Sequence, residues 1–100
     1  MSEPVRRMLV AYDIVDDRRR DRVAVALQEH GNRVQHSVFL VDGRPASFVR
    51  LQAALERLID PRVDGILFCD LGARDTTAAR AITYVGARRS WIDGGGAFIL

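Results

Sequence analysis

The sequence has a single cysteine, no lysine and no long apolar run. One thiol cannot form an intramolecular disulfide or a thiolate metal cluster, and Cys69 lies among apolar residues, so we predict that it is a small core residue. The longest apolar stretches, such as residues 66–69, are far shorter than the roughly 20 residues of a membrane-spanning helix. Residues 2–7 are not expected to begin a signal peptide. These absences predict a soluble, cytoplasmic protein with no membrane partner.

Most familiar catalytic motifs are also missing. The sequence contains no phosphate-binding loop and no dinucleotide-binding glycine motif. The two histidines, His30 and His36, lack the spacing and the cysteine partners of a zinc site. Ser37 follows His36 on a predicted strand, where neighbouring side chains point to opposite faces, so the two are not expected to form a nucleophile–base pair. Candidate chemistry is therefore sought among the carboxylates and arginines.

All fifteen basic residues are arginine, which exceed the thirteen acidic residues by two. A GC-rich genome explains arginine in place of lysine, but it does not require a cluster. Four arginines lie within five positions: Arg18, Arg19, Arg20 and Arg22. The planar guanidinium donates two parallel hydrogen bonds to phosphate, so we predict that this cluster binds nucleic acid without reading its sequence. The alternative is that Arg19 and Arg20 are solvated or pair with Asp16 and Asp17.

The apolar spacing predicts one α/β domain over residues 1–100, with two helices on a single face of one sheet. The expected elements are a strand over 7–14, a helix from Asp16 or Asp17 to about His30, a strand over 33–41, a helix from Pro45 that ends before Pro61, and strands over 65–71 and 81–85. Gly31 is expected to end the first helix as a C-terminal glycine. The core is expected to span about residues 8–85.

The chain ends in four apolar residues, 97–100, after three glycines at 94–96 that form a flexible joint. An apolar strand left exposed at a sheet edge invites aggregation, so we expect this segment to be covered. It should add as an edge strand to its own sheet or to that of a partner. Phe98 and Leu100 share a face of this strand and would fill pockets at the interface.

Asp13 is the candidate for chemistry, because it ends the apolar run of the first strand directly before a helix. The neighbouring Asp16 and Asp17 are expected to cap that helix and to interact with its dipole. One carboxylate is too few to hold Mg²⁺. Two copies from a symmetric dimer could hold it, with water and phosphate oxygens as the other ligands.

The residues around Asp13 resemble those of a known family. Tyr12-Asp13-Ile14 is followed by Arg20 and Arg22, and then by the string G-N-R-V-Q-H-S-V-F at 31–39. This pattern resembles the CRISPR-associated protein 2 family, whose members are small dimeric subunits of the spacer-acquisition machinery. The resemblance covers about residues 8–71 and is specific, although residues 40–43 depart slightly from the family's usual pattern.

The resemblance implies an α+β fold, a ferredoxin-like βαββαβ sandwich with an additional C-terminal edge strand, in which residues 33–41 form a short hairpin. It implies a homodimer whose two Asp13 carboxylates face each other across the two-fold axis and share one Mg²⁺. It also adds Arg33 to the arginines expected to bind nucleic acid. Members of the family are described as metal-dependent nucleases on RNA or double-stranded DNA, and as bridges between dimers of the CRISPR-associated protein 1 integrase.

Three functions are open at this point. The first is a Mg²⁺-dependent endonuclease with Asp13 as metal ligand and catalytic residue. The second is a binding module that clamps a duplex with its arginines and docks the integrase through its C-terminal strand. The third is a toxin-type endoribonuclease of similar fold, which the 31–39 string disfavours. Phe39 is expected to be structural, packed at or near the dimer interface rather than stacked on a base.

Overall fold

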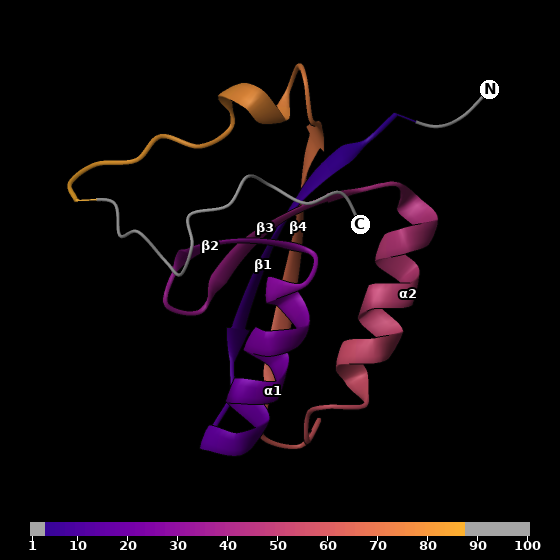
Figure 1. Cartoon of the computed structure of the whole chain (residues 1–100), viewed down its shortest axis with the longest axis vertical. Coiled ribbons are helices and arrows are strands. Elements are labelled where there is room, and N and C mark those ends of the chain that lie inside the picture. The colour runs from indigo at the N-terminus through magenta and orange to yellow at the C-terminus, as the bar shows by residue number, and fades with distance from the viewer. Residues whose placement is uncertain (1–3, 88–100) are drawn as a thin grey trace.

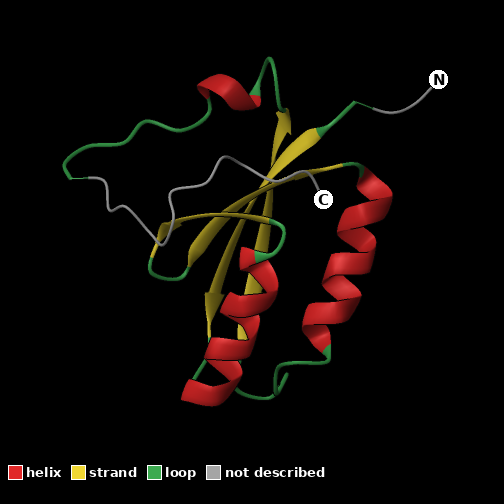
Figure 2. Cartoon of the chain, in the orientation of Figure 1, coloured by secondary structure: helices red, strands yellow, loops and turns green. Residues whose placement is uncertain are grey.

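A computed structural model describes residues 4–87 of the chain. The elements in this range are β1 (Arg6–Asp13), α1 (Asp17–Gln28), β2 (Gly31–Gln35), β3 (Val38–Gly43), α2 (Pro45–Glu56), β4 (Gly65–Ala73) and the 3₁₀ helix η1 (Ala78–Arg80). The strands pair antiparallel in the order β2-β3-β1-β4, and both helices cover the same face of the sheet (Figure 1, Figure 2). This is the ferredoxin-like βαββαβ arrangement, so the expected fold is confirmed.

The strand expected from the residue pattern over 33–41 is two strands, as the family resemblance implied. The chain turns at His36 and Ser37, between β2 and β3. Neither turn residue is glycine or proline, which is why the pattern gave no sign of the turn. The backbone N–H of Tyr12 donates to the Ser37 carbonyl oxygen at 3.1 Å. The turn is thereby attached to β1 directly before Asp13.

The core lies between the sheet and the two helices. Its buried residues are Val10, Tyr12, Ile14, Val23, Ala24, Leu27, Phe39, Val41, Phe48, Leu51 and Leu55. The expected helix starts are confirmed: Asp16 caps α1 by accepting the N–H of Arg19 at 2.9 Å, and Pro45 occupies the first turn of α2. Helix α1 ends at Gln28, two residues before the expected His30.

Gly31 begins β2 and does not end α1 as a left-handed residue, which corrects the expectation. The glycines with positive φ among residues 4–87 are Gly72 and Gly86. A Cβ atom built on Gly31 would lie 2.8 Å from a methyl group of Val41 and closer still to the Leu40 carbonyl oxygen. The position therefore needs glycine because β2 and β3 approach too closely for a side chain.

Gly31→Ala is expected to lower the free energy of unfolding by about 1–3 kcal/mol, because β2 must move away from β3 to admit the methyl group. Gly65→Ala is the matched control, since a Cβ there would meet no atom within 4 Å. Urea unfolding of both variants measures the difference. Equal midpoints for the two would mean that β2 shifts at no cost.

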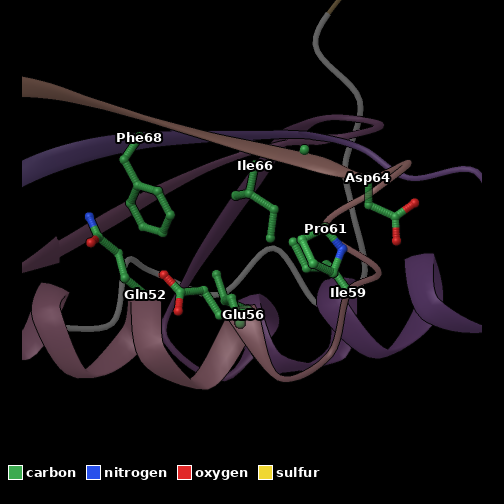
Figure 3. Close-up of a pocket in the computed structure, with 9 residues that line it drawn as sticks. Gln52, Glu56, Ile59, Pro61, Asp64, Ile66 and Phe68 are labelled. Carbon is green, nitrogen blue, oxygen red and sulfur yellow. The ribbon is translucent and has the colours of Figure 1, made fainter.

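Cys69 is exposed, which corrects its predicted place in the core. The reason is that β4 is an edge strand of the described sheet, and its side chains alternate between two faces of which only one is covered by helices. Ile66 and Phe68 point toward α2 (Figure 3), whereas Leu67 and Cys69 lie on the uncovered face. An apolar run by itself does not show that both faces are buried.

Residues 81–85 form no strand in the described part of the chain, contrary to expectation. Val85 is 90% exposed, and Ala78 in η1 is the last buried hydrophobic residue of the described range. A β-prone segment becomes a strand only where it finds a partner, and the chain after η1 runs away from the sheet (Figure 1). The expected joint at 94–96 and the edge strand with Phe98 and Leu100 lie outside the described residues.

Within residues 4–87, none of the helices combines the length and the apolar character that crossing a membrane requires.

Candidate functional site

Asp13 is the last residue of β1, and its side chain is exposed. Its carboxylate forms no hydrogen bond or ion pair with any residue in the range 4–87. Its backbone lies opposite Gly65, the first residue of β4. An exposed carboxylate with no partner among the described residues is available to a cation or to a group from outside.

Asp13 lies at one end of the sheet face that the helices leave uncovered. Leu9, Ala11 and Asp13 alternate onto this side of β1, and the strand register places further apolar residues beside them. We call this surface the open sheet face; its apolar residues are Leu9, Ala11, Val38, Leu40, Leu67 and Cys69. The ion pair between Arg7 and Asp42, with Nε and Oδ1 2.8 Å apart, lies at the opposite end.

The other carboxylates near Asp13 are already bonded within the chain. The Asp16 side chain accepts the backbone N–H of Arg19, which lowers the pKa of Asp16. Asp17 pairs with Arg20 at 2.6 Å. Both therefore belong to the start of α1, as the capping interpretation predicted.

Asp64, directly before β4, is a buried carboxylate whose side chain has no exposed surface. It accepts hydrogen bonds from Arg19 Nε at 2.7 Å and Nη2 at 3.3 Å, from the Val15 N–H at 3.0 Å and from the Asp60 N–H at 2.9 Å. The Arg19 guanidinium and the two backbone N–H groups hold the pKa of Asp64 well below its usual range. No local sequence pattern distinguishes Asp64, because its partner Arg19 lies 45 positions away in the chain.

The arginine cluster divides into two pairs with different surroundings. Arg19 binds Asp64, and Arg20 donates to the carbonyl oxygen of Ile14 at 2.9 Å as well as to Asp17. The pairing alternative is therefore right for Arg20, while Arg19 pairs with an aspartate from another part of the chain. Arg18 and Arg22 are exposed, and their side chains form no hydrogen bond or ion pair within residues 4–87.

Arg33 and Phe39 lie on the helix-covered side of the sheet. The Arg33 guanidinium carbon is 5.1 Å from the centre of the Phe39 ring, and Arg33 donates to the Tyr12 hydroxyl at 3.2 Å. The rings of Tyr12 and Phe39 stack at 6.3 Å between centroids. Phe39 is completely buried, as a structural role requires. The place of Phe39 at a dimer interface stays a prediction, and because its side chain is completely buried it could affect that interface only through its neighbours. The binding of nucleic acid by Arg33 also stays a prediction.

The described residues of one chain form no cluster of side-chain metal ligands. Among residues 4–87 no three histidine, cysteine or acidic side chains lie close enough together to hold one. Mg²⁺ prefers six oxygen ligands and is usually bound through one or two carboxylates together with water and phosphate. Asp13 fits such a site as one of two carboxylates, provided that a second copy of the chain supplies the other.

A groove of about 370 Å³ separates α2 from β4 (Figure 3). Ile66 and Phe68 point into it from β4, and Gln52 and Glu56 border it on α2. Asp64 lies at one end, but its oxygens already accept four hydrogen bonds. The groove thus brings no cluster of reactive side chains together, and Asp13 remains the candidate site.

Comparison with known proteins identifies the family. The family model for CRISPR associated protein Cas2 matches residues 6–78. CRISPR-associated endoribonuclease Cas2 3 of Rhodospirillum rubrum is 45% identical over 86 residues, which cover 81% of this chain and 87% of the relative. A protein of the same name from Synechocystis sp. is 38% identical over 69 residues, or 69% of this chain and 75% of the relative. The crystal structure of Streptococcus pyogenes Cas2 matches with a TM-score of 0.70 at 33% identity, over 80% of this chain and 99% of that one. The chain therefore belongs to the CRISPR associated protein Cas2 family.

Proposed function

We propose that this chain acts as a homodimer in CRISPR adaptation, binds double-stranded DNA or RNA and cleaves phosphodiester bonds with one Mg²⁺ held between two Asp13 carboxylates. The observation that carries the proposal is the exposed Asp13 carboxylate, which has no partner within residues 4–87 and lies at the end of the apolar sheet face that α1 and α2 leave uncovered. The relatives named above are called endoribonucleases, which supports nuclease activity and favours RNA as the substrate. Family membership supports this function over a toxin-type ribonuclease.

The homodimer is supported by the open sheet face. A contiguous apolar surface of this kind marks an interaction site, and Leu67 on it is 58% exposed. In a symmetric dimer the same surface of each copy forms the interface. A two-fold axis near the Asp13 end of this face would bring the two carboxylates together.

Leu67→Glu is expected to weaken the dimer at least about tenfold, because it places a charge and its symmetry mate within an apolar interface. Val25→Glu is the matched control: Val25 is 57% exposed but lies on α1, away from the open sheet face. Sedimentation equilibrium gives both dissociation constants. Dimers of equal strength would exclude the open sheet face as the interface.

The proposed chemistry depends on few side chains of the protein. A bound Mg²⁺ supplies Lewis-acid stabilisation of charge on the phosphate and an acidified water as nucleophile. Each Asp13 contributes one ionised carboxylate, and its position at the surface leaves room for a phosphodiester. No described side chain other than Asp13 is needed for the proposed metal contact.

Nucleic-acid binding is assigned to Arg18 and Arg22, because these two members of the cluster are exposed without side-chain hydrogen bonds or ion pairs in the described structure. They lie four residues apart on α1 and so share one side of its first turns. Arg20 and Arg19 are bound to the β1–α1 loop and to Asp64, and their replacement would disturb the fold as well as binding.

Joint replacement of Arg18 and Arg22 by alanine is expected to weaken binding of all duplexes about equally and to reduce the salt slope by about one per lost contact. The thermal midpoint should stay within about 2 °C, since neither side chain forms a hydrogen bond or ion pair with a residue in the range 4–87. Joint replacement of Arg50 and Arg80, which removes the same charge from other elements, is the control. A loss confined to particular sequences would point to base readout instead.

The activity itself is tested with the purified chain and end-labelled RNA and DNA duplexes, in Mg²⁺ and in chelator. Cleavage in Mg²⁺ that chelator stops supports the proposal. Tight binding with no cleavage of either duplex would favour the second candidate, a binding module that clamps a duplex and bridges the CRISPR-associated protein 1 integrase. The exposed Arg18 and Arg22 suit that function equally well.

A further inference from the structure

Three segments of the chain around Asp13 are joined by a single buried carboxylate, that of Asp64. Through its four hydrogen bonds it binds Val15 in the β1–α1 loop, Arg19 in the first turns of α1 and Asp60 in the α2–β4 loop. Asp64 itself precedes Gly65, which lies opposite Asp13 in the sheet. The Asp64 carboxylate therefore holds two backbone segments beside Asp13. One is at Val15, two residues after Asp13, and the other lies directly before Gly65, which faces Asp13 across the strand pair.

We propose that Asp64, held in place by Arg19, is a positioning residue for the Asp13 carboxylate; this rests on the proposed metal role of Asp13. The Asp13 side chain has no hydrogen bond or ion pair within residues 4–87, so its direction is set by the backbone that carries it. A metal ligand needs its orientation fixed to within a fraction of an ångström, which supporting hydrogen bonds usually provide. Here the supporting hydrogen bonds are made by Asp64 to the backbone near Asp13, and not to the Asp13 carboxylate itself.

The bonding pattern requires an ionised carboxylate. Two of its donors belong to a guanidinium and two are backbone N–H groups, so all four point hydrogens at the two oxygens of Asp64. Asparagine in this place has one oxygen and turns an NH₂ group toward at least one donor. Asp64→Asn thus releases part of the β1–α1 loop, the α2–β4 loop or Arg19 with almost no change in side-chain volume.

The chain contains a matched control at the other end of the sheet. Asp42 in β3 is 2% exposed and binds Arg7 with the same pair of guanidinium nitrogens, Nε at 2.8 Å and Nη2 at 3.1 Å. Arg7 and Asp42 face each other in the β1–β3 register, far along β1 from Asp13. Asp42→Asn therefore disrupts a similar buried pair without touching the loops beside Asp13.

The experiment is an NMR titration of the full-length chain with Mg²⁺, together with hydrogen exchange of the Val15 amide, for the wild type, Asp64→Asn, Arg19→Gln and Asp42→Asn. Positioning predicts that Asp64→Asn and Arg19→Gln both weaken Mg²⁺ binding, Asp64→Asn by about tenfold or more. An effect of charge alone predicts opposite results. Asp64→Asn removes a negative charge near the metal and would weaken Mg²⁺ binding, whereas Arg19→Gln removes a positive charge and would strengthen it. All four proteins are titrated at a concentration at which sedimentation shows a dimer, because Asp42 lies at the far end of the open sheet face. Under that condition Asp42→Asn should lower the thermal midpoint and leave the Mg²⁺ dissociation constant within about twofold.

Tighter Mg²⁺ binding by Arg19→Gln, or weakening by all three variants in proportion to their loss of stability, would overturn the proposal. Should the wild type bind no Mg²⁺, the proposed metal role of Asp13 is wrong, and exchange then decides the role of Asp64. If the Val15 amide hydrogen exchanges at least about tenfold faster in Asp64→Asn than in Asp42→Asn, this supports the conclusion that Asp64 fixes the β1–α1 loop. Equal rates in the two variants would refute it. If Asp64→Asn does not fold, Arg19→Gln still distinguishes positioning, which predicts weaker Mg²⁺ binding, from charge alone, which predicts tighter binding. Asp42→Asn remains its control.

Discussion

Asp13→Asn is expected to reduce Mg²⁺-dependent cleavage by at least about a hundredfold, while the thermal midpoint changes by less than about 2 °C. The activity falls because a neutral amide is a poor ligand for Mg²⁺, and metal stabilisation of the transition state amounts to several kcal/mol, with each ~1.4 kcal/mol worth a factor of ten. The midpoint stays because the Asp13 carboxylate is exposed and has no bond within residues 4–87 to lose. Initial rates on a labelled duplex and a thermal melt measure the two quantities.

The control for this prediction is Asp21→Asn. Asp21 lies on α1, is exposed, and its side chain forms no hydrogen bond or ion pair within the described residues, so the substitution changes net charge equally. It should leave both cleavage and midpoint unchanged. Cleavage at the wild-type rate by Asp13→Asn would end the catalytic interpretation, although a binding role for the dimer would survive it.

Phe39→Ala is expected to lower the free energy of unfolding by ~3–5 kcal/mol, the usual cost of removing a buried aromatic side chain from a core. Phe39 is completely buried, its ring stacks with that of Tyr12, and the Arg33 guanidinium lies over it. The cavity would loosen Tyr12 and the turn at 36–37, so we also expect weaker Mg²⁺ binding. Equilibrium unfolding in urea measures the loss.

Phe68→Ala is the comparison for Phe39→Ala. Phe68 is only partly buried, because it faces the groove between α2 and β4 (Figure 3), and its removal should cost clearly less. An unaltered midpoint for Phe39→Ala, combined with weaker binding of nucleic acid, would reverse the structural assignment and make Phe39 a stacking residue.

For the arginine cluster, the sequence predicted the positive charge but not the partner of each side chain. A run of four arginines indicates positive charge, but the pattern alone does not say which of them is free. Arg19 finds its partner 45 positions away, and Arg20 folds back onto the carbonyl oxygens of the loop before it. Arg18 and Arg22 point outward because the periodicity of α1 places them away from the buried Val23 and Leu27.

The open sheet face shows a second limit. Residues 66–69 read as a buried run because all four are apolar, but alternation sends Leu67 and Cys69 to the face opposite the helices. Whether that face is covered depends on how many layers the fold has, which no single strand encodes. Gly31 is a similar case: it needs to lack a side chain because Leu40 and Val41, nine and ten positions away, approach its backbone closely.

The sequence by itself determined the approximate positions of β1, α1, α2 and β4, the capping of α1 by Asp16, the start of α2 at Pro45 and the place of Asp13 at a strand end. Each of these depends on residues within one or two turns of chain, where periodicity, caps and proline act directly. The hairpin at 36–37 came from family resemblance and not from any local turn signal. Only the tertiary structure decided that Asp64 binds Arg19, that Cys69 faces outward and that residues 81–85 are not a strand. These outcomes depend on which surfaces meet when distant segments pack, and a buried ion pair or an edge strand exists only once they have met.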